Sequence, residues 1–248
     1  MKNLKYVVGC LVLVLAIAAT ASAQPTNAFD HAANYTSATW TNNSNGGYGF
    51  GLWTLTAHAD GGTGAGAYIG GSGENTAGPS FGIYGGTLGT STAFRAFSSA
   101  LTTAQTFSID LGNTTLTAGG ATLGLTFFSG ATPEFTLQFT GGQNFWQLND
   151  GGSFFNTSQG YVGNTPLLFT FKWNVTNSYS YTFGSSTGLN YYASNPISDL
   201  TGVNLYDNAQ GNGQNFGFDN IAIIPEPSTL ALIGLSLVGG WMLRPRKV

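Results

Sequence analysis

The sequence predicts an all-β protein: an antiparallel two-sheet sandwich of jelly-roll type, with an export segment at each end. Its 248 residues include 37 Gly, 18 Phe and 11 Tyr, and only 7% are charged, against a typical share of about 25%. Short runs of alternating apolar and polar residues fill the middle of the chain, separated by turn-forming Gly, Asn, Ser and Thr. An apolar segment lies near each terminus. Together these features favour one exported β domain.

The first 23 residues are typical of a secretory signal peptide. Lysines precede an apolar run from Val7 to Ala19, and the small residues Ala21 and Ala23 stand just before Gln24. This arrangement predicts export and cleavage after Ala23. The single cysteine, Cys10, leaves with this segment, so we expect no disulfide and no cysteine metal site in the mature chain.

Residues 24–223 are predicted to form the sandwich domain. The clearest strand is LLFTFKWNV, residues 167–175, in which every second residue is a large apolar one. The same alternation marks five further runs, at residues 107–111, 122–127, 135–139, 179–183 and 203–207. No stretch of this domain has a helical period, and its Gly, Thr and Asn content disfavours helix. The glycine-rich segment 59–79 is expected to be a long loop.

Three other runs resemble concanavalin-like sandwich domains. They are SFGIYGG at residues 80–86, AFRAF at 93–97 and FGFDNIAII at 216–224. The resemblance is at the level of the fold, so it implies a two-sheet architecture and no particular site.

Residues 224–248 contain an apolar run followed by cations. The run from Leu230 to Leu243 would be about 21 Å long as a helix, against a bilayer hydrocarbon core of about 30 Å. We expect a short transmembrane helix over about residues 229–243, although the length of the run also fits a buried core helix. Three cations follow at once and are predicted to stop transfer on the cytoplasmic side: Arg244, Arg246 and Lys247.

The tripeptide Pro225-Glu226-Pro227, with the apolar run and basic end behind it, resembles the PEP-CTERM sorting signal of Gram-negative bacteria. The resemblance covers about the last 25 residues. It implies transient anchoring in the inner membrane, processing by an exosortase, and release to the cell surface or extracellular space. Proteins with this signal typically occur with exopolysaccharide production, so exopolysaccharide is an implied partner. Because proline does not extend a helix, the two prolines favour an exposed, extended segment that a protease could bind.

The charge of the domain argues against nucleic acid as a partner. Two basic and nine acidic residues lie between Gln24 and Ile224, which gives this part a formal charge of −7. Binding of a polyanion requires a cationic face, and none is indicated. The two basic residues, Arg95 and Lys172, are expected to pair with acids.

Catalytic chemistry is weakly indicated, and we predict that the protein is not an enzyme. A glycosidase needs two carboxylates that face each other across a cleft, but the sequence has no run of acids two apart. Glu74 and Glu134 stand in apparent loops. His31 and His58 each have an aspartate nearby, yet no third partner for a metal or acid-base site is evident. No Gly-x-Ser-x-Gly elbow occurs.

Two loops are weak candidates for a calcium site, and no other cofactor is expected. Asp150 lies in the run NDGG, and Asp207 lies in YDNAQGNGQN. Both runs are dense in the oxygen donors that calcium prefers. Asp, Asn and Gly also form ordinary hairpin turns, so a structural role for both loops stays open.

Trp146 is the candidate glycan-binding residue. It lies in the run GGQNFWQLNDGG, where amide side chains flank two adjacent aromatic residues. Phe145 and Trp146 point to opposite faces of an extended chain, so one can pack inward while the other stays exposed. We select Trp146 as the exposed residue, with packing in the core as the alternative.

Three functions are compatible with these features. The first is a non-catalytic structural or adhesive component of the cell surface or extracellular matrix that associates with exopolysaccharide. The second is a discrete carbohydrate-binding module. The third is a secreted hydrolase with an unrecognised site.

Overall fold

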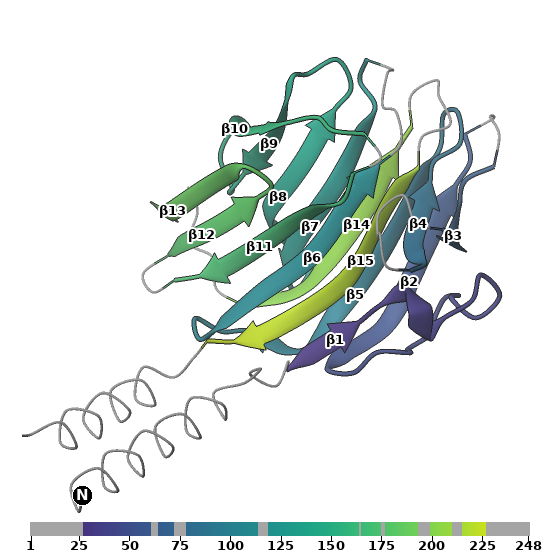
Figure 1. The fold of residues 1–248 in the computed structure, drawn as a ribbon, viewed down its shortest axis with the longest axis horizontal. Helices are drawn as coiled ribbons and strands as arrows, with labels where there is room; N and C mark the ends of the chain where they lie inside the picture. The colour runs from purple at the N-terminus through teal and green to yellow at the C-terminus, as the bar shows by residue number, and fades with distance from the viewer. Residues whose placement is uncertain are drawn as a thin grey trace, which may run out of the picture. The chain divides into compact units, whose positions relative to one another are not determined.

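A computed structural model divides the chain into two compact units, of which Thr26–Ile224 contains the folded domain and Met1–Pro25 with Pro225–Val248 forms the other. The structure describes residues 27–60, 64–71, 78–113, 119–163, 165–174, 177–192, 199–209 and 215–226. Two antiparallel sheets are stacked face to face, as Figure 1 shows. The predicted all-β sandwich is therefore confirmed.

Sheet A has eight strands among the described residues. Its order is β13 (Ser186–Tyr192), β12 (Ser178–Phe183), β11 (Leu167–Trp173), β6 (Gln105–Asn113), β15 (Phe216–Pro225), β4 (Ser80–Tyr84) and β3 (Gly66–Gly70), and β1 (Ala28–Asp30) also pairs with β15. A short 3-10 helix, η1 (Ala32–Asn34), follows β1. β4 pairs with the first part of β15 and β1 with the last part, so both lie along the length of one central strand.

Sheet B has seven strands among the described residues. Its order is β10 (Phe155–Gly160), β9 (Phe145–Asn149), β8 (Thr132–Thr140), β7 (Thr122–Ser129), β14 (Leu200–Asn208), β5 (Thr90–Leu101) and β2 (Phe50–His58). The chain crosses between the sheets several times, from β5 to β6, from β10 to β11 and from β13 through β14 to β15. These crossings give the interleaved, jelly-roll-like topology that the sequence predicts.

The core consists of the inward-facing aromatic residues of both sheets. Phe127 of β7 and Phe135 of β8 each pack on Phe171 of β11, with ring centroids 4.9 and 4.8 Å apart. The alternation in β11 is confirmed, because Phe169, Phe171 and Trp173 are all buried. The close contact of rings from opposite sheets is the interdigitation expected of sheets stacked about 10 Å apart.

The segment after β1 is fixed to the sandwich by a buried ion pair. Nη2 of Arg95, on β5, donates a hydrogen bond to Oδ2 of Asp30 at 2.7 Å. The Tyr35 hydroxyl and the Trp53 indole N–H donate to the same oxygen at 2.8 and 3.1 Å. Arg95 also donates to Oδ1 of Asn45 at 2.7 Å. The expectation that Arg95 pairs with an acid is confirmed, and the acid is Asp30.

Burial and pairing act on this ion pair in opposite directions. Both side chains are fully buried. Burial raises the pKa of Asp30, while the guanidinium of Arg95 and the hydrogen bonds from Tyr35 and Trp53 lower it. The guanidinium also lies over the Trp53 ring, 4.7 Å from its centroid. The pair links β1 of sheet A to β5 of sheet B across the core.

The prediction of a loop over residues 59–79 is wrong in part, because residues 66–70 form the strand β3. Ala67 and Ile69 pack against the core. The hydroxyl of Ser37 donates to the carbonyl of Ile69 at 3.0 Å and accepts its N–H at 3.1 Å, which caps the sheet edge. The glycines around these two apolar residues hide the alternation, so the strand depends on contacts that are distant in the sequence.

Candidate functional site

The outer face of sheet B is lined mainly by uncharged polar side chains. Every second residue of its strands points away from the core, as the burial pattern of β8 and β9 shows. The outward residues of the six strands from β10 to β5 are Asn156, Ser158, Phe145, Gln147, Asn149, Glu134, Thr136, Gln138, Thr140, Thr122, Gly124, Thr126, Phe128, Asn204, Tyr206, Asn208, Thr90, Thr92, Phe94 and Ala96. Glu134 is the one charged residue among these outward positions.

Hydrogen bonds join several of these side chains into a chain across the strands. The Tyr206 hydroxyl donates to Oε1 of Gln138 at 3.0 Å, and Nε2 of Gln138 donates to the Thr140 hydroxyl at 3.2 Å. Thr140 lies 3.4 Å from Oε1 of Gln147, and Nε2 of Gln147 donates to Oδ1 of Asn156 at 3.2 Å. The network holds these amide and hydroxyl groups in fixed positions on the outer face.

Tyr206 lies opposite a glycine on the neighbouring strand. Gly124 of β7 stands directly opposite Tyr206 in the pairing register. A Cβ at Gly124 would overlap the carbonyl oxygen of Leu137, so a side chain does not fit there. The Tyr206 side chain is half-buried on this face, and burial raises the pKa of its hydroxyl. The hydroxyl therefore stays protonated and acts as a donor to Gln138.

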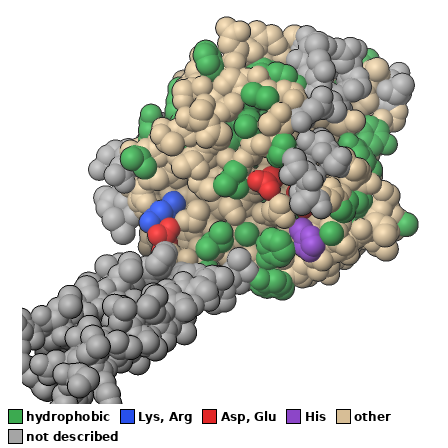
Figure 2. Space-filling model, viewed as in Figure 1, with side chains coloured by type: hydrophobic (Ala, Val, Ile, Leu, Met, Phe, Trp, Pro, Cys, Tyr) green, Lys and Arg blue, Asp and Glu red, His purple; other side chains and the backbone are tan. Residues whose placement is uncertain are grey.

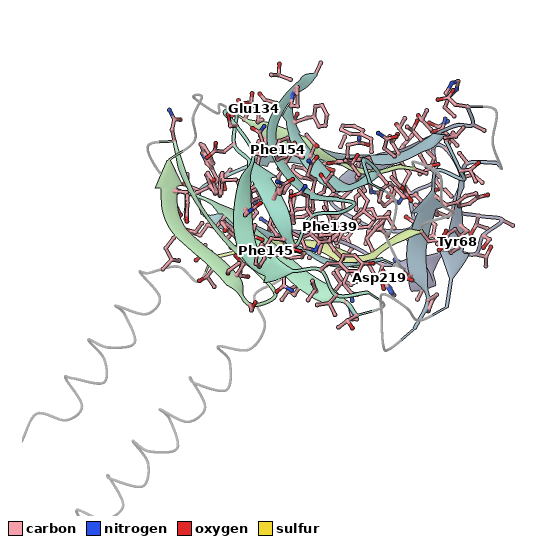
Figure 3. The ribbon with its side chains drawn as sticks, turned by 90° about the horizontal axis from the view of Figure 1, so that it is seen from above. Tyr68, Glu134, Phe139, Phe145, Phe154 and Asp219 are labelled. Atoms are coloured by element: carbon pink, nitrogen blue, oxygen red, sulfur yellow. The ribbon has the colours of Figure 1, made fainter. Side chains whose placement is uncertain are left out.

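A shallow hollow of about 310 Å³ lies at one end of this outer face. It is lined by residues of β8 and of the connection from β9 to β10: Pro133, Glu134, Thr136, Asn149, Gly151, Gly152 and Phe154. The volume is at the lower end of the range for small-molecule sites. Figure 3 shows Glu134 and Phe154 close together, and Phe145 lies apart from them. The hollow thus combines an aromatic ring, a carboxylate, an amide and a hydroxyl.

The turn after β9 shapes the hollow. The backbone N–H of Gly151 donates to Oδ1 of Asn149 at 2.9 Å, and Gly151 has a φ of 95°, which glycine adopts without strain.

Burial raises the pKa of the Glu134 carboxyl. The expectation that Glu134 lies in a loop is wrong, because it is an outward residue of β8. Its neighbour in the hollow, Phe154, is 42% exposed.

An apolar row continues from the hollow across the sheet. Pro133 of β8 is in register with Phe128 of β7, and Phe128 is in register with Gly202 of β14. The ring of Phe94, on β5, lies against Gly202, where a Cβ would come within 2.7 Å of it. Phe94 and Phe128 make an edge-to-face contact with centroids 6.2 Å apart. We name Phe154, Pro133, Phe128 and Phe94 the apolar row.

Trp146 does not lie on the outer face, so its selection as the exposed aromatic residue is wrong. Its side chain is 1% exposed, whereas that of Phe145 is 40% exposed. The Trp146 ring packs in the core against Phe139 and Phe183, at 5.7 and 4.9 Å between centroids. Alternation predicts that one of the two residues is buried, but the contacts with Phe139 and Phe183 decide which one.

The two calcium candidates do not come together as a metal site. Asp150 is buried and accepts a hydrogen bond from the Tyr179 hydroxyl at 2.9 Å. Asp207 lies inside β14 and is fully buried, so its placement in a loop is wrong. In the part of the chain that the structure describes, no three His, Cys, Asp or Glu side chains are grouped as metal ligands would be.

The remaining candidates lie apart from the hollow. His58 pairs with Asp60 at 2.8 Å on the surface, and His31 stacks on Phe29 with centroids 5.2 Å apart. Lys172 lies on β11 of sheet A, and Glu74 is outside the described residues. Figure 2 shows how few charged side chains appear on the side of the molecule seen in Figure 1. Phe154, Phe128 and Phe94 are not predicted from the sequence. The signal for Phe94 and Phe128 is their alternation with buried residues of β5 and β7, whereas Phe154 lies in the connection before β10, where no alternation marks it.

The sorting tripeptide begins inside the last strand. β15 ends at Pro225, and Glu226 is the last described residue. Close to this end, the N–H of Asn27 donates to the carbonyl of Ile223 at 2.8 Å. Pro227, the expected helix at 229–243 and the other terminal residues of the prediction lie outside the described residues: Arg244, Arg246, Lys247, Ala21, Ala23 and Gln24. Within the described segments, no helix has the length and apolar character needed to span a bilayer.

Comparison with known protein families confirms the C-terminal signal. Residues 224–247 match the family described as the PEP-CTERM protein-sorting motif. The chain carries a PEP-CTERM sorting motif. This motif implies export, membrane-associated sorting and processing by an exosortase. The match covers the end of the chain, so it does not describe the sandwich domain.

Comparison with solved structures supports the fold of the domain. A sialidase superposes with a TM-score of 0.59 at 11% identity, covering 83% of this chain and 19% of the sialidase. A cellulose induced protein, Cip1, superposes with a TM-score of 0.51 at 12% identity, covering 69% of this chain and 90% of Cip1. At these identities the likeness shows the fold alone. No curated protein matches the sequence.

The strand that ends at Pro225 sets an expected limit on processing. β1 pairs with Ile221, Ala222 and Ile223 of β15, so a cut upstream of these residues would remove that pairing from the folded domain. We therefore expect the secreted form to start at Gln24 and to end at Pro225 or a few residues beyond it, without Leu230–Val248. Intact-mass spectrometry of protein from culture supernatant measures both ends. Recovery of the complete tail from the supernatant, or of a C-terminus well before Pro225, would contradict this expectation.

Proposed function

We propose that this protein is sorted by an exosortase to the cell surface or extracellular matrix of a Gram-negative bacterium, where it binds exopolysaccharide without cleaving it. The outer face of sheet B is the binding surface, and the hollow beside Phe154 is its centre. The sorting motif supports the extracellular setting. The composition of the hollow supports the ligand class, and it is the observation on which the proposal rests.

The side chains of the hollow match the chemistry of a sugar ring. A sugar presents apolar C–H groups on its ring faces and hydroxyl groups around its edge. The exposed ring of Phe154 suits the first, and the amide of Asn149 and the hydroxyl of Thr136 suit the second. Glu134 adds a strong acceptor for a sugar hydroxyl. Next to the hollow, the chain of hydrogen bonds through Gln138 and Gln147 offers further amide groups.

The same set of residues argues for binding rather than hydrolysis. Glycosidases use two carboxyl groups across a cleft, and Glu134 is the one ionisable side chain among the lining residues of the hollow. Asp150, close by in sequence, is buried and bonded to the Tyr179 hydroxyl. We therefore assign Glu134 to hydrogen bonding with the ligand and not to proton transfer.

Replacing Phe154 with alanine should weaken retention on the polysaccharide of the producing bacterium by on the order of tenfold, because it removes the exposed ring of the hollow. Phe145→Ala is the matched control: it removes an aromatic residue of similar exposure from the same sheet face, away from the hollow. Retention of the two variants and of the unaltered chain is measured by a pull-down, corrected for the folded fraction. Equal losses in both variants would argue against the hollow.

The absence of catalysis is tested on the same samples. Glu134→Gln keeps an acceptor oxygen in the hollow, so we expect retention of this variant to fall by no more than severalfold. We expect no reducing ends to appear with this variant, with the unaltered chain or with the two phenylalanine variants. Release of reducing ends that stops in Glu134→Gln would show a hydrolase and overturn the assignment of Glu134.

A further inference from the structure

The outer face of sheet B carries an apolar feature that begins in the hollow and extends beyond it. The apolar row runs from Phe154 across β8, β7 and β14 to Phe94 on β5. Three strand spacings separate β8 from β5, which is about 14 Å. The rings of Phe94 and Phe128 contact each other on this face and lie outside the core cluster. The hollow is therefore one end of a longer path.

A row of polar side chains lies beside the apolar row for most of its length. Asn204 of β14 is in register with Thr126 of β7, Thr126 with Thr136 of β8, and Thr136 with Asn149 of β9. The hydroxyls of Thr126 and Thr136 are 3.0 Å apart. A ligand that crosses the strands would thus meet apolar surface along one side and hydroxyl or amide groups along the other. An extended chain of linked rings has this form, whereas a single small molecule fills only the hollow.

The charges near this path exclude one class of polymer. Glu134 is the one charged side chain at the described outward positions between β10 and β5. Arg95 lies on β5 but is buried with Asp30, and Lys172 belongs to sheet A. A polyuronate would find no cation here, and its carboxylates would be repelled by Glu134 and by the formal charge of −7 between Gln24 and Ile224, where two basic and nine acidic residues lie.

We propose that the outer face of sheet B takes an uncharged polysaccharide chain, laid across the strands from the hollow at Phe154 to the contact of Phe128 with Phe94. This inference rests on the proposed function and specifies its ligand. Rings of the polymer stack along the apolar row, and their hydroxyls bond to the parallel polar row at Asn149, Thr136 and Asn204. Glu134 selects against acidic sugars at the entrance of the path.

The class of ligand is tested with polymers of defined charge. Full-length protein in nonionic detergent is passed over immobilised mixed-linkage β-glucan, galactomannan and dextran, and over alginate and polygalacturonate. We expect retention on at least one uncharged polymer, reduced on the order of tenfold in Phe154→Ala, and no displacement from it by either polyuronate. Displacement by a polyuronate would overturn the inference but leave the proposed function standing. No retention on any of the five polymers would overturn both.

The length of the path is tested with the retained polymer and its fragments. Phe94→Ala removes the far end, so binding of the polymer should weaken about fivefold, while binding of a disaccharide, which reaches only the hollow, should not change. Since the Phe94 ring also lies against Gly202, the thermal midpoint of the variant is measured in parallel. Phe128→Ser is the second variant and should give the same difference between polymer and disaccharide. Equal binding of the polymer by all three proteins would overturn a path across the strands.

Discussion

Replacing Asp30 with alanine should lower the free energy of unfolding by about 3 to 5 kcal/mol, because it leaves the Arg95 guanidinium buried without its counter-ion. Three donors converge on one carboxylate oxygen of Asp30, from Arg95, Tyr35 and Trp53. Domains of this size are stable by only about 5 to 15 kcal/mol, so the loss would leave a marginal fold. Urea unfolding followed by tryptophan fluorescence is the measurement.

Arg95→Met tests the other half of the pair. At low pH it should lower the free energy of unfolding by less than Asp30→Ala does. A carboxyl group can neutralise itself by taking a proton, whereas a guanidinium cannot lose one in a protein. Without Arg95, burial keeps the pKa of Asp30 above its ordinary value. A raised folded-state pKa stabilises the fold below the unfolded-state pKa, and that contribution is lost as pH rises through the folded-state value. Stability of Arg95→Met should therefore fall between mildly acidic and neutral pH.

Asp60→Asn provides the control for these variants. Asp60 pairs with His58 at the surface, where solvent screens the interaction. We expect the free energy of unfolding of Asp60→Asn to equal that of the unaltered protein within error. If Asp30→Ala unfolded at the same urea concentration as Asp60→Asn, the buried pair would not hold the N-terminal segment in place.

Trp146→Ala should lower stability by about 3 to 5 kcal/mol through loss of buried surface and the cavity it leaves. The ring packs between Phe139 and Phe183. Retention on polysaccharide, expressed per folded molecule, should not change, because the side chain does not reach the outer face. Thermal melting and the pull-down are measured on the same preparation.

Two further variants separate packing from ligand contact. Trp146→Phe should lower stability much less than Trp146→Ala, because a ring is kept. The substitution also removes the indole N–H, which has no hydrogen-bond partner among the described residues. Phe145→Ala should change the thermal midpoint little, since its ring is 40% exposed. A loss of polysaccharide retention in folded Trp146→Ala would contradict the placement of Trp146 in the core.

Periodicity predicts the strands of this fold well where large apolar residues alternate with polar ones. The run at residues 167–175 is the clearest example, and β11 buries the predicted side. β3 escapes prediction because its two inward residues stand among glycines and because Ser37 caps it from a distant segment. β1 has only three residues, and its pairing with β15 joins the two ends of the domain. Such short or glycine-rich strands depend on tertiary contacts rather than on local pattern.

The candidate site was harder to predict than the fold. Alternation indicates that one of Phe145 and Trp146 is exposed, but two adjacent aromatic residues satisfy the pattern in either register. Glu134 and Phe154 are 20 positions apart, and the hollow exists only because β8 and the end of β9 are neighbours. Arg95 needs a counter-ion, yet its partner Asp30 is 65 residues away. Sequence pattern supplies the types of residue, and strand order decides which of them meet.

Binding of polysaccharide at the outer face of sheet B can be observed directly by mapping backbone amide chemical-shift changes. The domain Gln24–Ile224 is labelled with nitrogen-15 and titrated with soluble fragments of the polymer that it retains. We expect the perturbed amides to cluster at Thr136, Asn149 and Phe154 and to extend along the apolar row to Phe94, while Thr170 and Thr182 on the outer face of sheet A do not shift. Perturbations confined to sheet A, or spread evenly over both sheets, would contradict binding at this face.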